Sequence, residues 1–361
     1  MRRSNSTTLK DVAREAGVTV MAASVVLNGA VSSARVGPAT RARILEAAAR
    51  LRYRRNVAAL GLSRRRMNTI GVVSTIVSRT VNLYYVEVLT GILATAAEHG
   101  QSTSILTIGS WTKDESRIIE FCDGRIDGLI LIGPEVTPAF ADLLVQHAPV
   151  VALHGSGSRS IPTIDVDNAG GARLATQYLL DLGHTQLLHL AGRPTAKAGI
   201  ERIAGFRGAL EDRSVEFRNE MLLPGDFVSE SGYSRTLALA DRVGKGRMPT
   251  GIVCANDAIA FGCMDALRER RISVPGDVSV VGFDDTLLAR IVRPALTTIH
   301  QPFADISRRA VETLLAQIEM DQLAGPLPAG SDFAVENFPE ETVAVNLIIG
   351  ESTGPPRRSD A

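Results

Sequence analysis

Small or polar residues follow the strands predicted in the main part of this 361-residue chain. Asn256-Asp257 and Asp284-Asp285 carry amide and carboxylate oxygens, which accept hydrogen bonds from hydroxyl groups. The other residues at strand ends are Ser74-Thr75, Ser110, Gly133, His154-Gly155 and Gly192-Arg193. Because ligands of open parallel sheets bind outside the carboxyl ends of the strands, this set predicts a site for a small polar molecule with hydroxyl groups.

Asn and Asp at these positions have a second explanation, because the same side chains cap helices. Asn256-Asp257 stands directly before a helix predicted from Ala258, so capping explains one member of the pair at least as well as ligand binding does. No strong helical pattern follows Asp284-Asp285, and a ligand role is favoured there.

The motifs that mark common enzyme classes are missing from the sequence. It contains no GxGxxG after a strand, no GxxxxGK[ST], no GxSxG and no HExxH. The six histidines match no metal-ligand spacing, and only His154, at a strand end, is a candidate ligand contact. We therefore predict a binding protein rather than an enzyme, without a metal or cofactor.

Alternating strands and helices must position these residues from Asn68 onward. The predicted strands cover 70–73, 104–108, 128–132, 150–153, 186–191, 251–255 and 278–283, and the helices cover 86–99, 115–122, 138–146, 171–182, 200–211, 230–243, 258–270 and 305–319. This alternation predicts α/β architecture, with parallel sheets covered by helices on both faces. So many units need more than one sheet, so we expect two similar lobes with the ligand between them.

The N-terminal residues predict a different, all-helical unit. Thr8 and Asp11 form a capping signal for one helix, Gly17 supplies a sharp turn, Thr19 caps a second helix, and Pro38 fits the start of a third. A helix, a glycine turn and a second helix make a helix-turn-helix, whose second helix enters the DNA major groove. An ordinary helical bundle has the same pattern, so these residues alone leave both interpretations open.

The net charge of zero hides a strong asymmetry. Up to residue 66 the chain has fourteen basic and three acidic residues, whereas the remainder has 25 basic and 36 acidic residues. A basic head on an acidic body is typical of a polyanion-binding module joined to a separate body, although a solvated basic face would show the same count.

Cys122, Cys254 and Cys263 form no CxxC pair, which suits reduced thiols and a cytoplasmic location. No signal peptide or transmembrane run is recognisable, so no membrane association is expected.

Four blocks in this order resemble the LacI/GalR family of bacterial transcriptional regulators: TLKDVAREAGVTVMAASVVLNG, DNAGGARLATQYLLDLGH, CANDAIAFGCMDALRERRISVPGDVSVVGFDD and RPALTTIHQP. The resemblance implies a helix-turn-helix head, a hinge helix and a two-lobed body like periplasmic sugar-binding proteins. It also implies a homodimer, or a tetramer built from dimers, that binds double-stranded operator DNA under the control of a sugar-like effector. A solute-binding protein without DNA function is the alternative, and the basic head argues against it.

The resemblance sets expected boundaries. The head covers 1–54, the hinge helix and linker 55–67, the effector-binding and dimerisation body 68–350, and a disordered tail 351–361. The first lobe is expected at about 68–165 and 300–332, and the second at about 166–297 and 333–350. The chain would therefore cross between the lobes near 163–168, 294–302 and 330–335.

The resemblance also carries over functional positions. In the base-reading helix Thr19–Asn28, apolar side chains face the groove, so thymine methyl contacts and DNA shape would carry much of the specificity. The expected DNA contacts are Thr8, Thr19, Val20, Met21, Ser24, Val25, Asn28, Tyr53, Asn56, Ala59 and Leu62. The expected effector contacts are Thr75, His154, Arg202, Phe227, Asn256, Asp284 and Gln301. Arg202 would bind a hydroxyl pair or carboxylate in bidentate fashion, Asp284 would accept from sugar hydroxyls, and Phe227 would wall the ligand or pack in the core.

The hinge generates a first prediction. If Leu62 is the apolar wedge that enters the minor groove, Leu62→Ala lowers the affinity for operator DNA more than the affinity for random duplex DNA. The two dissociation constants are measured by fluorescence anisotropy at one fixed salt concentration. An equal loss on both DNAs would contradict the wedge role.

Overall fold

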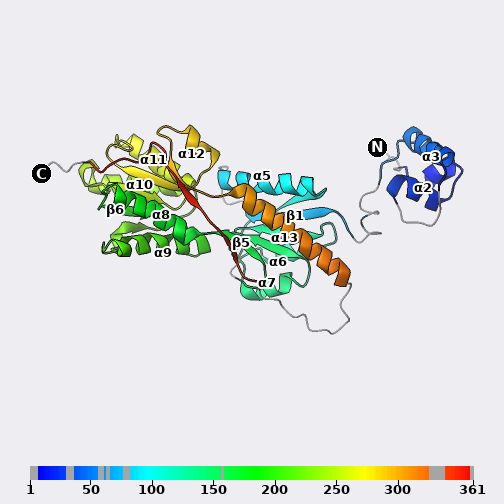
Figure 1. Ribbon diagram of the computed structural model, residues 1–361, viewed down its shortest axis with the longest axis horizontal. Helices are drawn as coiled ribbons and strands as arrows, with labels where there is room; N and C mark the ends of the chain where they lie inside the picture. Colours follow the sequence, from blue (N-terminus) through cyan, green and yellow to red (C-terminus); the bar gives the residue numbers. More distant parts are fainter. Residues whose placement is uncertain are drawn as a thin grey trace. The chain divides into compact units, whose positions relative to one another are not determined.

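The chain forms two compact units, residues 1–68 and residues 69–361. The computed structural model in Figure 1 describes residues 7–29, 36–55, 61, 66–75, 82–155, 158–324 and 338–357. The expected hinge contacts Asn56, Ala59 and Leu62 lie outside these residues. No helix in the described part of the chain is long and apolar enough to cross a membrane.

The head consists of α1 (Leu9–Glu15), α2 (Val20–Asn28) and α3 (Pro38–Arg50), as the sequence predicts. Thr8 and Asp11 form a capping box, in which each side chain accepts a hydrogen bond from the other residue's backbone N–H. Gly17 takes φ +61° in the turn, and the Thr19 hydroxyl accepts from the Ala22 backbone N–H at 3.2 Å to start α2. Val12, Val26, Leu27, Ile44 and Ala47 are among the residues of its small core.

The first lobe of the body is built on a six-stranded sheet in the order β11-β5-β4-β3-β1-β2. Its strands are β1 (Thr69–Thr75), β2 (Ser102–Ile108), β3 (Gly128–Ile132), β4 (Val150–Leu153), β5 (Thr163–Val166) and β11 (Glu341–Val343), and all pair in parallel. Helices α5 (Leu83–Glu98) and α13 (Phe303–Ala324) lie side by side on one face (Figure 1). Helices α6 (Ser116–Glu120) and α7 (Pro138–Leu144) pack in a separate apolar cluster on the other face.

The second lobe repeats this plan, with a sheet in the order β12-β10-β9-β8-β6-β7. Its strands are β6 (Leu187–Leu190), β7 (Leu222–Leu223), β8 (Gly251–Cys254), β9 (Ser279–Asp284), β10 (Thr297–His300) and β12 (Asn346–Ile348), of which only β12 is antiparallel to its neighbour. Helices α8 (Asn168–Asp181) and α9 (Lys197–Asp212) pack together on one face of this sheet, and helices α10 (Ser229–Val243) and α11 (Asp257–Glu269) pack together on the other. The described part of this lobe also contains α12 (Leu287–Ile291) and two short 3₁₀ turns, Asn219–Met221 and Lys245–Arg247. The predicted α/β class with two doubly wound sheets is confirmed.

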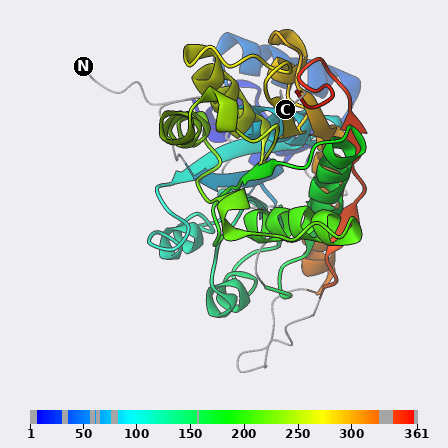
Figure 2. The same cartoon turned by 90° about the vertical axis from the view of Figure 1, so that its left-hand side faces the viewer.

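The third crossing between the lobes differs from the prediction. The first two fall between β5 and α8 and between β10 and α13, within the expected ranges. However, β11 pairs with β5 of the first sheet and β12 with β10 of the second, so the last crossing lies at residues 344–345 rather than at 330–335. The C-terminal stretch runs from one lobe to the other beside α8 (Figure 1 and Figure 2). Both strands have only three residues, too few for an alternating apolar pattern to reveal them.

Residues 351–357 were expected in a disordered tail, and that expectation is wrong for this segment. The buried Ser352 hydroxyl accepts from the Thr297 N–H at 2.8 Å and donates to the Val280 carbonyl at 2.6 Å. The Arg357 guanidinium donates to three carbonyls, those of Lys245, Gly246 and Met248. The polar composition concealed this segment because its side chains bond to backbone groups of the second lobe instead of packing as an apolar stripe.

Candidate effector cleft and DNA-reading head

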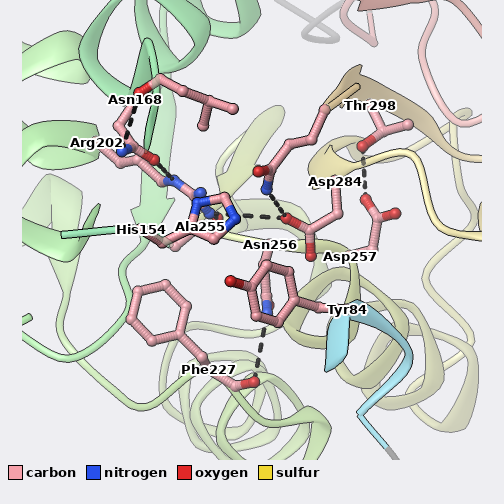
Figure 3. A network of polar contacts seen from close by, with 12 residues as sticks. Tyr84, His154, Asn168, Arg202, Phe227, Ala255, Asn256, Asp257, Asp284 and Thr298 are labelled. Carbon is pink, nitrogen blue, oxygen red and sulfur yellow. Dashed lines mark hydrogen bonds and ion pairs between the residues drawn. The ribbon is translucent and has the colours of Figure 1, made fainter. Parts of the chain in front are cut away.

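Arg202 is the central charged residue of the cleft between the lobes. It lies on α9 with its side chain only 5% exposed. Its guanidinium donates to the Asn168 side-chain oxygen at 2.9 Å and to the Ala255 carbonyl, and lies 4.0 Å from the Asp284 carboxylate (Figure 3). The Phe283 ring lies beneath it, 3.6 Å from ring centroid to guanidinium carbon. Burial lowers the pKa of Arg202, although a guanidinium stays charged in proteins.

Asp284 ends β9 and faces Arg202. It has φ 131°, a region that favours glycine, so the backbone is strained at this buried carboxylate. Burial raises its pKa to about 7, while Arg202 and the Gln301 amide, which donates at 2.6 Å, oppose that rise. Burial also raises the pKa of the neighbouring Asp257, whose carboxylate accepts from Thr286 and Thr298. The cleft therefore holds two carboxyl groups whose ionisation is opposed by burial.

Asn256 and Phe227 form the next part of the cleft wall. The Asn256 side-chain oxygen accepts from the Ile259 N–H at 2.9 Å and so caps α11, which confirms the capping interpretation for this residue. Its amide nitrogen donates to the Phe227 carbonyl at 3.3 Å. The Phe227 ring packs so closely on Gly192 that a Cβ there would meet ring atoms at 2.2 Å. The strand-end glycine thus makes room for the aromatic wall.

The first lobe contributes His154, at the end of β4, and Tyr84, at the start of α5. The Tyr84 ring meets the His154 ring edge-on, with centroids 5.2 Å apart (Figure 3). The His154 Nδ1 lies 3.3 Å from the Asp165 carboxylate. Burial opposes ionisation of Asp165, but the His154 hydrogen bond and the Lys197 charge bring its pKa down to about 2. Thr75, the remaining predicted contact, is hydrogen-bonded to Tyr85 beside this group.

Three side chains of the cleft were not found from the sequence. Tyr84 and Lys197 each precede the predicted start of their helix, and Asp165 lies in a four-residue strand that was not predicted. Lys197 donates to Asp165 at 3.1 Å and to Glu340 at 2.8 Å, and so joins the second lobe to the first. The signal available in the sequence for Asp165 was an acidic residue between two apolar ones, because a carboxylate buried in a strand needs a partner.

A cavity of about 320 Å³ opens beside this cluster. Asn82, Leu83 and Tyr84 line it from the first lobe, while the second lobe supplies Ser229, Ala258, Phe261, Gly262, Asp265, Asp284, Thr286 and Leu288. Tyr84, Asp284 and Thr286 belong to both the cavity and the polar cluster. The other predicted effector contacts do not line this cavity.

The head presents an apolar surface on α2. Val20 and Met21 are 42% and 56% exposed, and Ser24, Val25 and Asn28 are half-buried. Thr8 and Thr19 are exposed at the starts of α1 and α2, and Tyr53 is half-buried against the head core. Exposed apolar side chains at the start of a second helix suit contact with thymine methyl groups.

Models of known protein families match the head and the two-lobed body separately. The fold and site are those of a two-lobed ligand-binding protein that carries a helix-turn-helix head. Residues 8–56 match the model of the bacterial regulatory proteins of the lacI family, and residues 176–353 match that of a periplasmic binding protein-like domain.

Relatives match over most of the chain. The HTH-type transcriptional repressor PurR of Vibrio parahaemolyticus is 33% identical over 318 residues, 86% of this chain and 92% of its own length. Catabolite control protein A of Priestia megaterium is 31% identical over 313 residues, 85% of this chain and 91% of its own length. The chain belongs to the LacI family of bacterial transcriptional regulators.

Solved structures agree with this assignment. The Lac repressor dimer bound to operator and the anti-inducer ONPF superposes with a TM-score of 0.81 at 27% identity, covering 97% of this chain and 100% of that one. The complex of the transcriptional regulator CelR with cellobiose gives a TM-score of 0.68 at 27% identity, covering 96% and 99%.

The raised pKa of Asp284 generates a stability prediction. The pKa of about 7 in the folded protein exceeds the ordinary value of 3.8. The stabilising contribution of Asp284 to the free energy of unfolding is therefore full below about pH 4 and is lost as the pH rises to 7. Asp284→Asn cannot ionise. Between pH 4.5 and pH 8, the variant's free energy of unfolding therefore improves relative to the parent by on the order of 3 kcal/mol. Urea unfolding of both proteins at the two pH values measures this change, and a difference that does not vary with pH would contradict it.

Proposed function

We propose that this LacI-family regulator represses transcription by binding a pseudo-palindromic operator as a homodimer, and that a small polar effector in the cleft controls its operator affinity. The observation that carries the proposal is the buried polar cluster around Arg202 and Asp284, at the strand ends between two lobes, in a chain with a helix-turn-helix head. We also propose that it acts in regulation rather than catalysis, and in the cytoplasm, where operator DNA lies.

Residues of both lobes meet at this cluster, and that supports coupling between effector and DNA. Tyr84 and His154 come from the first lobe, whereas Arg202, Asn256 and Asp284 come from the second. A ligand that touches both sides has a different affinity for each lobe arrangement. It therefore shifts the population of arrangements, and the same free energy links effector affinity to operator affinity in both directions.

The functional test separates the two sites. Operator sequences are selected from a random duplex pool, and effectors are identified by the rise in melting temperature of the purified protein with sugars, sugar phosphates and purines. Asp284→Ala is expected to lower effector affinity about tenfold or more, because a charge-assisted hydrogen bond is lost. It should abolish the effector's influence on DNA while operator affinity without effector stays unchanged.

Asp212→Asn, at an exposed carboxylate on α9, is the matched control and should keep the response. If folded Asp284→Ala protein no longer bound operator, or still responded to effector, the assignment of the cleft would be wrong.

Exposed apolar side chains on the body support the homodimer. Ile105 on β2 and Leu287 on α12 are 55% and 61% exposed, and Val86, Leu93 and Ile291 are exposed on the same group of elements. Strand β2 is at the edge of the first sheet, and the Leu287 N–H donates to Glu87 of α5 at 3.3 Å, so these elements adjoin. A patch of this kind, spread over both lobes, suits a self-complementary contact with a second copy of the chain.

Placing a charge in this patch tests the dimer. Leu93→Asp is expected to produce monomers in sedimentation velocity, because a carboxylate in an apolar interface loses its hydration. Operator affinity should fall at least about tenfold, because one subunit reaches only one half-site. Leu323→Asp, at an exposed position near the end of α13, is the control. A dimeric Leu93→Asp protein would place the interface elsewhere.

A further inference from the structure

The outward face of α2, the second helix of the helix-turn-helix, is largely apolar. The residues of α2 that pack in the core of the head are Ala23, Val26 and Leu27. At about 3.6 residues per turn, the opposite side of the helix carries Val20, Met21, Ser24, Val25 and Asn28. Met21 is the most exposed of these five, at 56%. The face that can enter the major groove is therefore centred on two apolar side chains, those of Met21 and Val25.

The polar groups of α2 are few. Its nine residues, VMAASVVLN, include none of the Arg, Lys or Gln side chains that read guanine or adenine through two hydrogen bonds. The Thr19 hydroxyl before it accepts from the Ala22 N–H at 3.2 Å and so caps the helix. Asn28 is the last residue of α2, whereas a recognition helix contacts base edges with its N-terminal residues. The first turn of α2 therefore offers apolar contact rather than bidentate hydrogen bonds.

The charged side chains of the head lie on other segments. In the described part of the head the exposed basic residues are Lys10, Arg14, Arg41, Arg43, Arg50, Arg52, Arg54 and Arg55. The acidic groups of α1 are paired, Asp11 with Thr8 and Arg14, and Glu15 with Arg50. Basic side chains attract the phosphates whatever the base sequence is. These residues can thus supply affinity for DNA, while α2 is the described helix that is placed to distinguish bases.

Apolar side chains recognise one group in the major groove. Thymine carries a methyl group on C5, which uracil and cytosine lack, and 5-methylcytosine carries the same methyl group at the same place. Contact between this group and Met21 or Val25 removes apolar surface of both partners from water. An aliphatic side chain makes no strong hydrogen bond to the neighbouring O4 of thymine or amino group of cytosine. The methyl group is therefore the feature of a pyrimidine that such a face distinguishes.

We propose that α2 reads the 5-methyl groups of pyrimidines, through Met21 and Val25 at its centre and Val20 at its start, and that the operator affinity of this regulator therefore depends on cytosine methylation. At the positions that these side chains contact, a pair of 5-methylcytosine with guanine replaces a pair of thymine with adenine. Methylation of cytosine there raises operator affinity. This inference rests on the proposed function, because it names the feature of the operator that the same head recognises.

The first test uses the full chain and the operator selected from the random duplex pool. Each thymine of the half-sites is replaced in turn by uracil, in both half-sites at once, and the dissociation constant is measured by fluorescence anisotropy at one fixed salt concentration. At least one replacement should lower the affinity about tenfold, because about fourfold is expected for each methyl group that is lost. No loss at any thymine, or a selected operator without thymine in its half-sites, would overturn the proposal.

The same operator position then separates methyl recognition from hydrogen bonding. A cytosine–guanine pair placed there should bind about as weakly as the uracil operator, and methylation of that cytosine on C5 should restore most of the lost affinity. Methylation of a cytosine outside the half-sites is the control and should have no effect. If the methylated cytosine bound no better than the unmethylated one, the methyl group would not be what α2 recognises.

Two variants assign the methyl contact to α2. Met21→Ala and Val25→Ala each shorten an apolar side chain of the outward face and introduce the best helix former, so the head should stay folded. In at least one of them, the affinities for the thymine and uracil operators should differ by less than about twofold. Leu45→Ala, at an apolar position of α3 that is 48% exposed, is the matched control and should keep the parent's ratio. If both α2 variants kept that ratio, the methyl effect would arise from DNA shape and the proposal would be wrong.

The operator assay also separates this inference from the proposed function. If an effector alters operator affinity but uracil and 5-methylcytosine do not, the regulatory role stands and methyl recognition is wrong. If operator affinity depends on the methyl groups but no effector alters it, methyl recognition stands and the effector control fails.

Discussion

The pairing of the buried Arg202 guanidinium is the interaction on which the cleft depends. A charge removed from water is costly unless polar partners surround it. Here the partners come from three places in the second lobe: Asn168 at the start of α8, the Ala255 carbonyl after β8, and Asp284 at the end of β9. These strand and helix ends can converge only because the sheet is doubly wound. The contacts that fold the second lobe therefore offset the free-energy cost of burying this charged group.

Some polar groups of that site are strained or have no partner among the described residues. Asp284 has a strained backbone and a pKa raised by burial, and the His154 Nε2 atom and the Gln301 side-chain oxygen have no hydrogen-bond partner among the described residues. Such groups lower the stability of the unliganded protein and raise the free energy available to a ligand that pairs with them. Lys197, which bonds carboxylates of the first lobe, meanwhile holds the lobes together across the cleft. In the proposed function, effector affinity and lobe closure therefore depend on the same contacts.

Much of the architecture could be predicted from local patterns. The capping residues Thr8 and Thr19 and the turn at Gly17 locate the helix-turn-helix, because these signals act within a few residues. The strands with four or more apolar residues, such as 128–132, were also recognisable. Strands β5, β7, β10, β11 and β12 were not, because they have two to four residues and form through pairing with distant strands. The same reason misplaced the last crossing and concealed the ordered segment 351–357.

The sequence by itself determined the class of protein: a basic helical head, a two-lobed α/β body, and polar strand ends such as Asn256 and Asp284 that chemistry alone marks as candidates. Only the tertiary structure decided which of these residues share a site and in what state. It brought Tyr84, Asp165 and Lys197 into the cleft, used Asn256 as a helix cap, and gave the His154 Nε2 atom no hydrogen-bond partner within the part of the chain that the structure describes. The physical reason is that burial, pairing and tautomer depend on atoms far apart in the chain, whereas capping and apolar patterns depend on near neighbours.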